Sequence, residues 1–304
     1  MQKQKNNDII FSKAKLAFSM AVFGTIGLFV RGIPFPSSFI AMTRGIAGVA
    51  FLLLLNLIRR KRIDFAAVRK NLPVLFLSGA AIGVNWILLF EAYNYTSVAT
   101  ATLCYYLAPI FVTLASPFVL KEKLTVKKLF CVLCALFGMV FVSGVFESGG
   151  VSSSDFRGIF FGTGAAVFYS SVMLLNKKLR DIGDTDRTVF QLLFASAVVS
   201  PYVFLTENVT AFEYTAKAVI LLLVVGIVHT GFAYTLYFGS VGRLPAQTTA
   251  LFSYIDPVVA ILLSALALRE GLTLFGIIGA VLILGSTLFG EINIKLPLVK
   301  REKK

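Results

Sequence analysis

The feature that most restricts the fold of this chain is a series of long apolar runs separated by short polar segments. A helix needs roughly 20 apolar residues to cross a bilayer, and only helices or closed barrels can satisfy the backbone there. The runs are too long and too uniform for barrel strands. They comprise residues 16–30, 39–58, 72–92, 98–120, 129–146, 159–175, 188–205, 218–238, 245–268 and 273–289. The sequence therefore predicts an all-α membrane protein with ten transmembrane helices.

Composition points to the same class. The 304 residues are 57% hydrophobic and 14% charged, and the mean hydropathy is +0.84. Soluble domains average about 45–50% apolar and about 25% charged residues. No cleavage site follows the first apolar run, so it is interpreted as a retained helix. The cysteines, including the pair Cys131 and Cys134, lie inside apolar runs and are interpreted as packing residues.

The net charge of +14 arises mainly on one side of the predicted membrane. With the N-terminus inside, Lys and Arg collect in the inner loops and in both tails, residues 1–13 and 291–304. The exceptions are Arg31, Arg157, Lys217 and Arg269 outside, and Arg44 within a helix. This bias is typical of cytoplasmic loops. Both termini are therefore expected in the cytoplasm, and the charge requires no nucleic-acid partner.

The chain repeats itself. The stretch "YYLAPIFVTLASPFVLKEKLT" (105–125) aligns with "SYIDPVVAILLSALALREGLT" (253–273). The aligned residues include three pairs: Tyr106 with Tyr254, Pro109 with Pro257, and Glu122 with Glu270. Each half has five predicted helices, an odd number, so the second half enters the membrane from the opposite side. This predicts two inverted five-helix repeats, an arrangement that many secondary transporters share.

These features resemble the EamA-like family of the drug/metabolite transporter superfamily, over about residues 14–289. The resemblance rests on the two halves, on "MTRGIAG" with Arg44, on the repeated Pro and Glu-x-Leu-Thr pattern, and on "YIDPVV" with Asp256. It implies two EamA-like repeats, 14–146 and 156–290, around a central substrate cavity. It also implies export or import of amino acids, drugs or other small metabolites. The chain departs from the family at Arg269, where a glycine is common.

Asp256 is the first candidate for a functional residue, because no other charged residue lies between 246 and 268. A charge at the bilayer centre costs about 2.5–3.5 kcal/mol on insertion scales. The adjacent Pro257 frees a backbone carbonyl. Asp256 is interpreted as a substrate or proton site, or as a buried carboxylate that holds a kink. Its counterpart in the first half is Ala108, so the charge occurs in only one repeat.

His229, the only histidine, is expected at the depth of Asp256, because both lie about equally far from the turn at Arg243. The two side chains could share a proton near neutral pH. The alternative is a histidine that bonds a backbone carbonyl.

Aromatic residues follow helical stripes on the same predicted helix pairs. They either pack the core or line the cavity, where they would suit apolar, aromatic or cationic substrates. Arg44 either extends to the membrane interface, binds a substrate carboxylate or pairs with Glu91. The candidates for binding or coupling, besides Asp256 and His229, are Tyr254, Trp86, Tyr105, Tyr106, Tyr234, Asn85 and Arg44.

Other residues are interpreted as structural. Pro109 and Pro257 are expected to kink their helices. Glu122 and Glu270 each precede a Leu-Thr pair, in which Thr125 and Thr273 are predicted N-caps of the next helix.

The predicted function is secondary-active export of a small metabolite, such as an amino acid or a drug-like compound, by alternating access around a midplane cavity. The alternatives are a membrane protein that acts on lipids and a passive channel. One histidine and scattered acids do not form a catalytic cluster, and no P-loop motif occurs. No enzymatic activity, cofactor or metal site is therefore expected. The expected partners are a small-molecule substrate and the lipid bilayer, with a homodimer left open. The expected location is the cell membrane, a bacterial inner membrane.

Overall fold

The structure is a computed structural model that describes residues 2–96, 98–142, 156–268 and 273–291. In this part of the chain all regular secondary structure is helical. Seven helices are long and apolar enough to cross a membrane, and a shorter apolar helix spans Leu274–Gly290. The prediction of an all-helical membrane protein is confirmed. The number of ten spans, their inverted arrangement and the side of the termini remain predictions.

The first half of the chain forms six helices, because one of the apolar runs is divided. They are α1 (Gln2–Val30), α2 (Ser37–Ile58), α3 (Phe65–Tyr95), α4 (Val98–Tyr105), α5 (Ala108–Leu120) and α6 (Val126–Val142). Asp64 caps α3 by accepting the N–H of Ala67 at 3.0 Å. Thr125 caps α6 by accepting the N–H of Lys128 at 3.3 Å, as predicted.

The second half begins with α7 (Phe156–Asn176) and α8 (Asp184–Thr206), followed by a 3-10 turn, η2 (Val209–Ala211). The next helix is continuous but changes its winding: α9 (Ala216–Val224), the π-helix η3 (Val225–Phe232) and α10 (Ala233–Val241). The last described helices are α11 (Ala246–Phe252), α12 (Ile255–Leu268) and α13 (Leu274–Glu291). Thr273 caps α13 through the N–H of Gly276 at 3.0 Å, which confirms the second predicted N-cap.

The runs that contain Pro109 and Pro257 are interrupted rather than simply kinked. Pro109 lies in the first turn of α5, and Pro257 lies in the first turn of α12. A proline is well tolerated there, because the first N–H groups of a helix have no partner within it. Each predicted kink is therefore a boundary between two shorter helices, and the two boundaries occupy equivalent places in the two halves.

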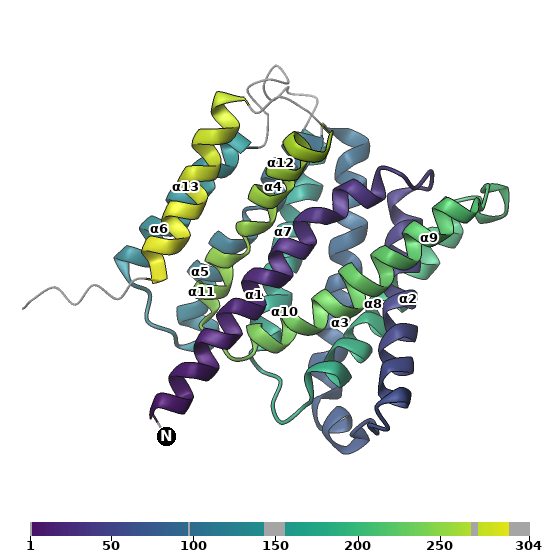
Figure 1. Ribbon diagram of the computed structural model, residues 1–304, viewed down its shortest axis with the longest axis horizontal. Coiled ribbons are helices and arrows are strands. Elements are labelled where there is room, and N and C mark those ends of the chain that lie inside the picture. Colours follow the sequence, from purple (N-terminus) through teal and green to yellow (C-terminus); the bar gives the residue numbers. More distant parts are fainter. Residues whose placement is uncertain (1, 97, 143–155, 269–272, 292–304) are drawn as a thin grey trace, which may run out of the picture.

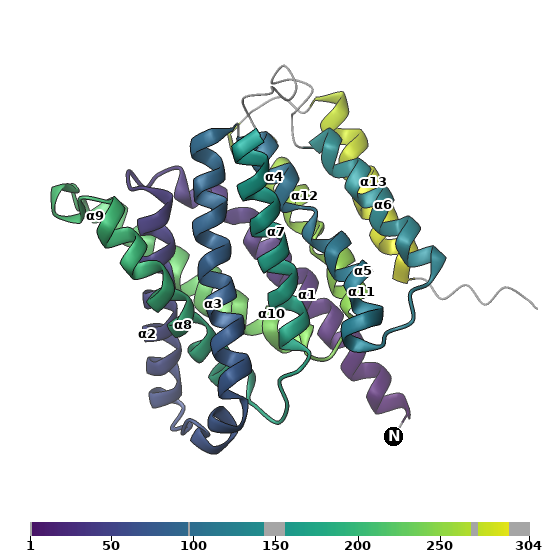
Figure 2. The same cartoon turned by 180° about the vertical axis from the view of Figure 1, so that it is seen from behind.

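The helices of the two halves pack reciprocally. Helix α1 lies against α12 and α10, whereas α7 lies against α3, α4 and α5. In the same way α2 packs on η3, and α3 packs on α8. Helices α6 and α13 pair with each other at one edge of the molecule (Figure 1, Figure 2). Helices from both halves therefore surround the centre of the molecule.

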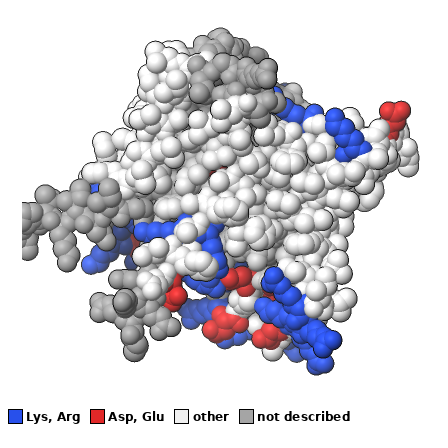
Figure 3. Space-filling model, viewed as in Figure 1, with Lys and Arg blue, Asp and Glu red and all other residues white. Residues whose placement is uncertain are grey.

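The two ends of the bundle differ in charge. Most of the Lys and Arg visible in Figure 3 lie at the lower end, where α1 begins. We call this the basic end; its exposed cations include Arg60, Lys70, Lys121 and Lys178. The flanks of the bundle expose large apolar side chains, such as Phe118 and Phe160. A surface of this kind is suited to lipid rather than to water.

Candidate functional site

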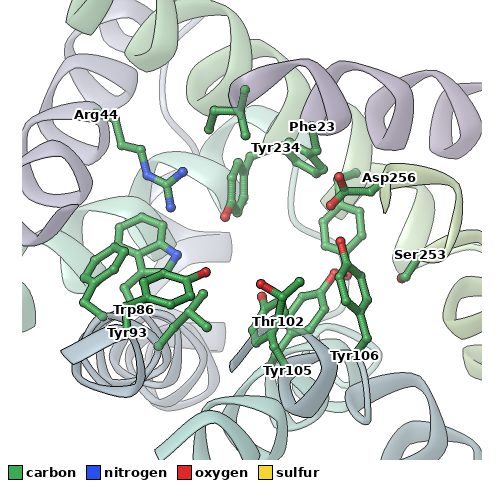
Figure 4. A pocket seen from close by; sticks show the side chains of 15 residues that line it. Phe23, Arg44, Trp86, Tyr93, Thr102, Tyr105, Tyr106, Tyr234, Ser253 and Asp256 are labelled. Atoms are coloured by element: carbon green, nitrogen blue, oxygen red, sulfur yellow. The ribbon is translucent and has the colours of Figure 1, made fainter. Parts of the chain in front are cut away.

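A cavity of about 270 Å³ lies between the two halves of the molecule (Figure 4). Its walls come from α1, α2, α3, α4, α7, α10 and α12, together with the turns that precede α5 and α12. The residues proposed from the sequence that line it are Arg44, Trp86, Tyr105, Tyr106, Tyr234 and Asp256. Residues far apart in the sequence thus meet at one site.

Arg44 and Asp256 face the cavity from opposite walls (Figure 4). Arg44 projects from α2, and Asp256 projects from the first turn of α12. Within the described part of the chain, neither side chain forms an ion pair. The cavity therefore offers one cation and one acidic group to whatever occupies it.

The Arg44 guanidinium is held by an aromatic ring. Its central carbon lies 4.4 Å from the centre of the Trp86 ring, and its buried Nε has no hydrogen-bond partner. Stacking on a ring leaves the N–H edge of a guanidinium able to bind a carboxylate. The described residues contain no ion pair of Arg44 with Glu91; Glu91 instead accepts a hydrogen bond from the Tyr202 hydroxyl.

Asp256 is positioned by the interruption between α11 and α12. The sequence placed it near the middle of one helix, but the structure places it at a helix start. Unpaired N–H groups and the positive end of the helix dipole favour a carboxylate at this position. The Tyr106 hydroxyl points toward Asp256 (Figure 4). Helix α1 passes close to the same turn: a Cβ added at Gly24 would lie 2.6 Å from the Asp256 carbonyl oxygen.

Tyrosines form much of the remaining wall. The rings of Tyr105 and Tyr169 stack with centroids 5.2 Å apart, and the hydroxyls of Tyr169 and Tyr237 lie 3.2 Å apart. Tyr93, Tyr169 and Tyr237 line the cavity but were not proposed from the sequence. Tyr93 and Tyr237 belong to aromatic stripes that the sequence displays, whereas no sequence signal identifies Tyr169.

Two predicted site residues instead join helices beside the cavity. Tyr254 is fully buried, and its hydroxyl donates to the Tyr106 carbonyl at 3.1 Å, which links the two helix interruptions. The Asn85 amide donates to the Ala165 carbonyl at 2.6 Å, which links α3 to α7. The structure does not place either side chain in the wall of the cavity described above.

The proposed pairing of His229 with Asp256 is not formed. The His229 Nε2 lies 2.8 Å from the Thr25 hydroxyl, and the ring packs edge-on against Phe29 at 4.9 Å. Thr25 on α1 thus contacts His229, while its neighbour Gly24 contacts the backbone of Asp256. The two residues contact different sides of α1, which separates them although their sequence positions suggest equal depth.

The cavity is closed toward the basic end. Its lining starts at Tyr93, near the end of α3 that lies away from the basic end, and reaches Tyr169 and Tyr237. Beyond these tyrosines, α7 and the segment after α10 contribute buried apolar residues such as Met173 and Leu244. Packed side chains therefore separate the cavity from the basic end.

Glu122 lies at this closed end. Both carboxylate oxygens accept the N–H of Ala246, each at 3.0 Å, and the Lys177 ammonium lies 3.9 Å away. Burial lowers the pKa of Lys177 from 10.5 to about 8, while the Glu122 charge acts in the opposite direction. Glu270, the counterpart of Glu122 in the second repeat, lies outside the described residues.

Comparisons with known proteins agree with this architecture. A model of the EamA-like transporter family matches residues 14–144 and 156–290. The uncharacterised transporter YxxF of Bacillus subtilis (strain 168) is 27% identical over 303 residues, which cover 99% of this chain and 93% of that protein. The uncharacterised transporter YoaV of the same organism is 26% identical over 238 residues, covering 78% and 80%. One crystal structure with 18% identity superposes with a TM-score of 0.82 over 92% of this chain and 97% of that chain, which shows the shared fold.

Proposed function

Since the chain belongs to the EamA-like transporter family, we propose that it is a secondary-active exporter of a small zwitterionic metabolite, such as an amino acid with an aromatic or apolar side chain. It resides in the cell membrane with its basic end in the cytoplasm. It works by alternating access, with two inverted repeats around the cavity.

The observation that supports this substrate class is the pair of opposite charges in one cavity. A buried charge without a partner is costly. A substrate with a carboxylate near Arg44 and an ammonium group near Asp256 would pair both at once. A neutral drug-like compound would leave both charges without a partner.

The size and the wall of the cavity support the same class. A volume of about 270 Å³ lies just below the range of about 300–1,000 Å³ that is usual for drug-sized ligands. It suits a molecule with the dimensions of an amino acid. The rings of Trp86, Tyr105 and Tyr234 offer an apolar surface to a substrate side chain.

The closed floor supports a carrier in preference to a passive channel. A channel needs a continuous polar path, whereas Tyr169 and Tyr237 meet across the cavity floor and buried apolar residues follow. A carrier instead exposes its site to one side at a time.

The test is transport by purified protein in proteoliposomes. It compares three molecules of one size: an aromatic amino acid, the amine that lacks its carboxylate and the acid that lacks its ammonium group. The parent protein should transport the amino acid at least about tenfold faster than the other two, a difference of about 1.4 kcal/mol.

Two variants assign the charges. Arg44→Gln should abolish the preference for the amino acid over the amine, and Asp256→Asn should abolish its preference over the acid. Asn94→Ala, at an exposed site on α3, is the control and should behave as the parent. Equal transport of all three molecules by the parent would contradict the zwitterion. The Asp256→Asn variant is compared with the parent at equal insertion into the membrane. If its transport rate, its selectivity and its response to a pH gradient are all unchanged, Asp256 has no role.

A further inference from the structure

We infer that Glu122 is a latch residue that keeps the cavity closed at the basic end, and that its contacts with α11 and Lys177 must break when the cavity opens there. This inference rests on the proposed alternating access. We call the Glu122 carboxylate, the Ala246 N–H and the Lys177 ammonium the basic-end latch.

The latch joins segments from both halves of the molecule at one carboxylate. Glu122 follows α5 in the first half, Lys177 follows α7, and Ala246 begins α11 in the second half. Both Glu122 oxygens contact the Ala246 N–H. The side chains of Glu122 and Lys177 are only 23% and 11% exposed. Separation of α5 from α11 therefore requires these contacts to break.

Further polar contacts attach α11 to α5, to the loop after α5 and to the first turn of α6. The Gln247 amide donates to the Ser116 hydroxyl at 3.1 Å and to the Lys123 carbonyl at 3.3 Å. The Lys128 ammonium donates to the Thr248 hydroxyl at 3.3 Å. Water can replace hydrogen bonds of this kind at little net cost. Polar contacts of this kind can therefore break and re-form as α11 moves.

The latch is connected to the cavity through two short helices, α11 and α5. Helix α11 leads from Ala246 directly to Ser253 and Asp256, which line the cavity. Helix α5, which precedes Glu122, follows directly on Tyr105 and Tyr106, which also line the cavity. Movement of α11 away from Glu122 would therefore open the floor and shift Asp256 at the same time. This gives a substrate held by Asp256 a physical route by which to influence the latch.

The test measures access to the cavity from each side of the membrane and needs no substrate. Ser253→Cys places a reporter thiol in the cavity of a protein whose Cys104, Cys131 and Cys134 are replaced by alanine. A membrane-impermeant maleimide is applied to one side of vesicles with known protein orientation. Glu122→Ala should raise the labelling rate from the basic side about tenfold and lower it from the opposite side. Lys177→Met should change both rates in the same directions.

Lys70→Met is the matched control, because it removes an exposed ion pair with Asp181 at the same end; it should label as the parent does. A second variant, Glu122→Cys with Ala246→Cys, should form a disulfide on oxidation and block labelling from the basic side until it is reduced. Any of three results would overturn the latch. Glu122→Ala could label as the parent does, or its labelling could be faster by the same factor from both sides. The oxidised Glu122→Cys/Ala246→Cys pair could also still be labelled from the basic side. Failure of the zwitterion transport assay would leave these labelling results interpretable.

Discussion

At the scale of single residues, Asp256 shows how an apolar segment accommodates a carboxylate. Its position in the first turn of α12 provides N–H groups that lack partners within the helix. The following Pro257 needs no such partner, so the turn satisfies both residues. Arg44 is accommodated differently, by the face of Trp86. Each charge has local support, yet each remains available to a ligand.

The contact between His229 and Thr25 gives a prediction that separates packing from proton coupling. Thr25→Val removes the hydroxyl partner of the imidazole. Such interhelical bonds contribute about 0.6 kcal/mol on average in membrane proteins, so the thermal midpoint in detergent should fall slightly. Transport and its response to a pH gradient should stay unchanged in Thr25→Val and in His229→Gln, because His229 does not line the cavity. If a well-folded His229→Gln variant lost the response of transport to a pH gradient, this would contradict the prediction and support a role of His229 in proton coupling.

Lys177 gives a prediction for pH. The pKa of Lys177 is lowered to about 8 in the folded protein from 10.5, so the unfolded chain binds this proton more tightly. Raising the pH from about 8 to about 10.5 should therefore favour the folded state through this residue. Below pH 8 the residue is protonated in both states, and the cost of burying its charge is constant.

The measurement compares the thermal midpoints of the parent and Lys177→Met in detergent across this pH range. The difference should shift in favour of the parent as the pH rises. Lys70→Met should show no such trend, because Lys70 is exposed. A flat or opposite trend for Lys177→Met would contradict the lowered pKa.

At the scale of helices, the pairing of α6 with α13 depends on backbone contact. A Cβ added at Gly138 on α6 would lie 2.7 Å from the Gly279 carbonyl oxygen of α13. Gly138→Ala should therefore push the helices apart and destabilise the fold by about 1–3 kcal/mol. Thermal unfolding in detergent measures the effect.

Gly285 on α13 is the matched control, since a Cβ there meets no atom within 4 Å. Gly285→Ala should be neutral or slightly stabilising, because alanine favours a helix over glycine. Equal destabilisation by both substitutions would mean that helix propensity, and not the contact between α6 and α13, sets the effect.

At the scale of the whole molecule, the charge difference between the two ends predicts the orientation in the membrane. Single cysteines in the cysteine-free background at Lys123, in the basic end, and at Glu213, in the segment between η2 and α9, should report opposite sides. An impermeant thiol reagent applied to intact cells should label Glu213→Cys and leave Lys123→Cys unlabelled until the membrane is permeabilised. Labelling of Lys123→Cys in intact cells would reverse the orientation and the direction of every transport step.

Features that depend on neighbours along the chain were predictable from the sequence. Hydropathy indicated helices in a membrane, because the bilayer imposes the same requirement on each segment. The N-caps Thr125 and Thr273 followed from short motifs, since capping is a bond within one turn. The repeat marked Pro109 and Pro257 as equivalent, although it did not show that the helices stop there.

Features that depend on how helices rotate and pack were decided only by the tertiary structure. Sequence spacing gives the depth of a residue along a helix, but not the direction in which it faces. His229 and Asp256 were therefore expected together, yet α1 separates them. Tyr169, which no motif marks, reaches the cavity because α7 packs beside α4 and α5. The sequence by itself determined that the chain is a bundle of membrane helices with an unusual carboxylate. The packing of the two halves decided that this carboxylate faces Arg44 across one cavity, because only packing fixes which sides of the helices meet.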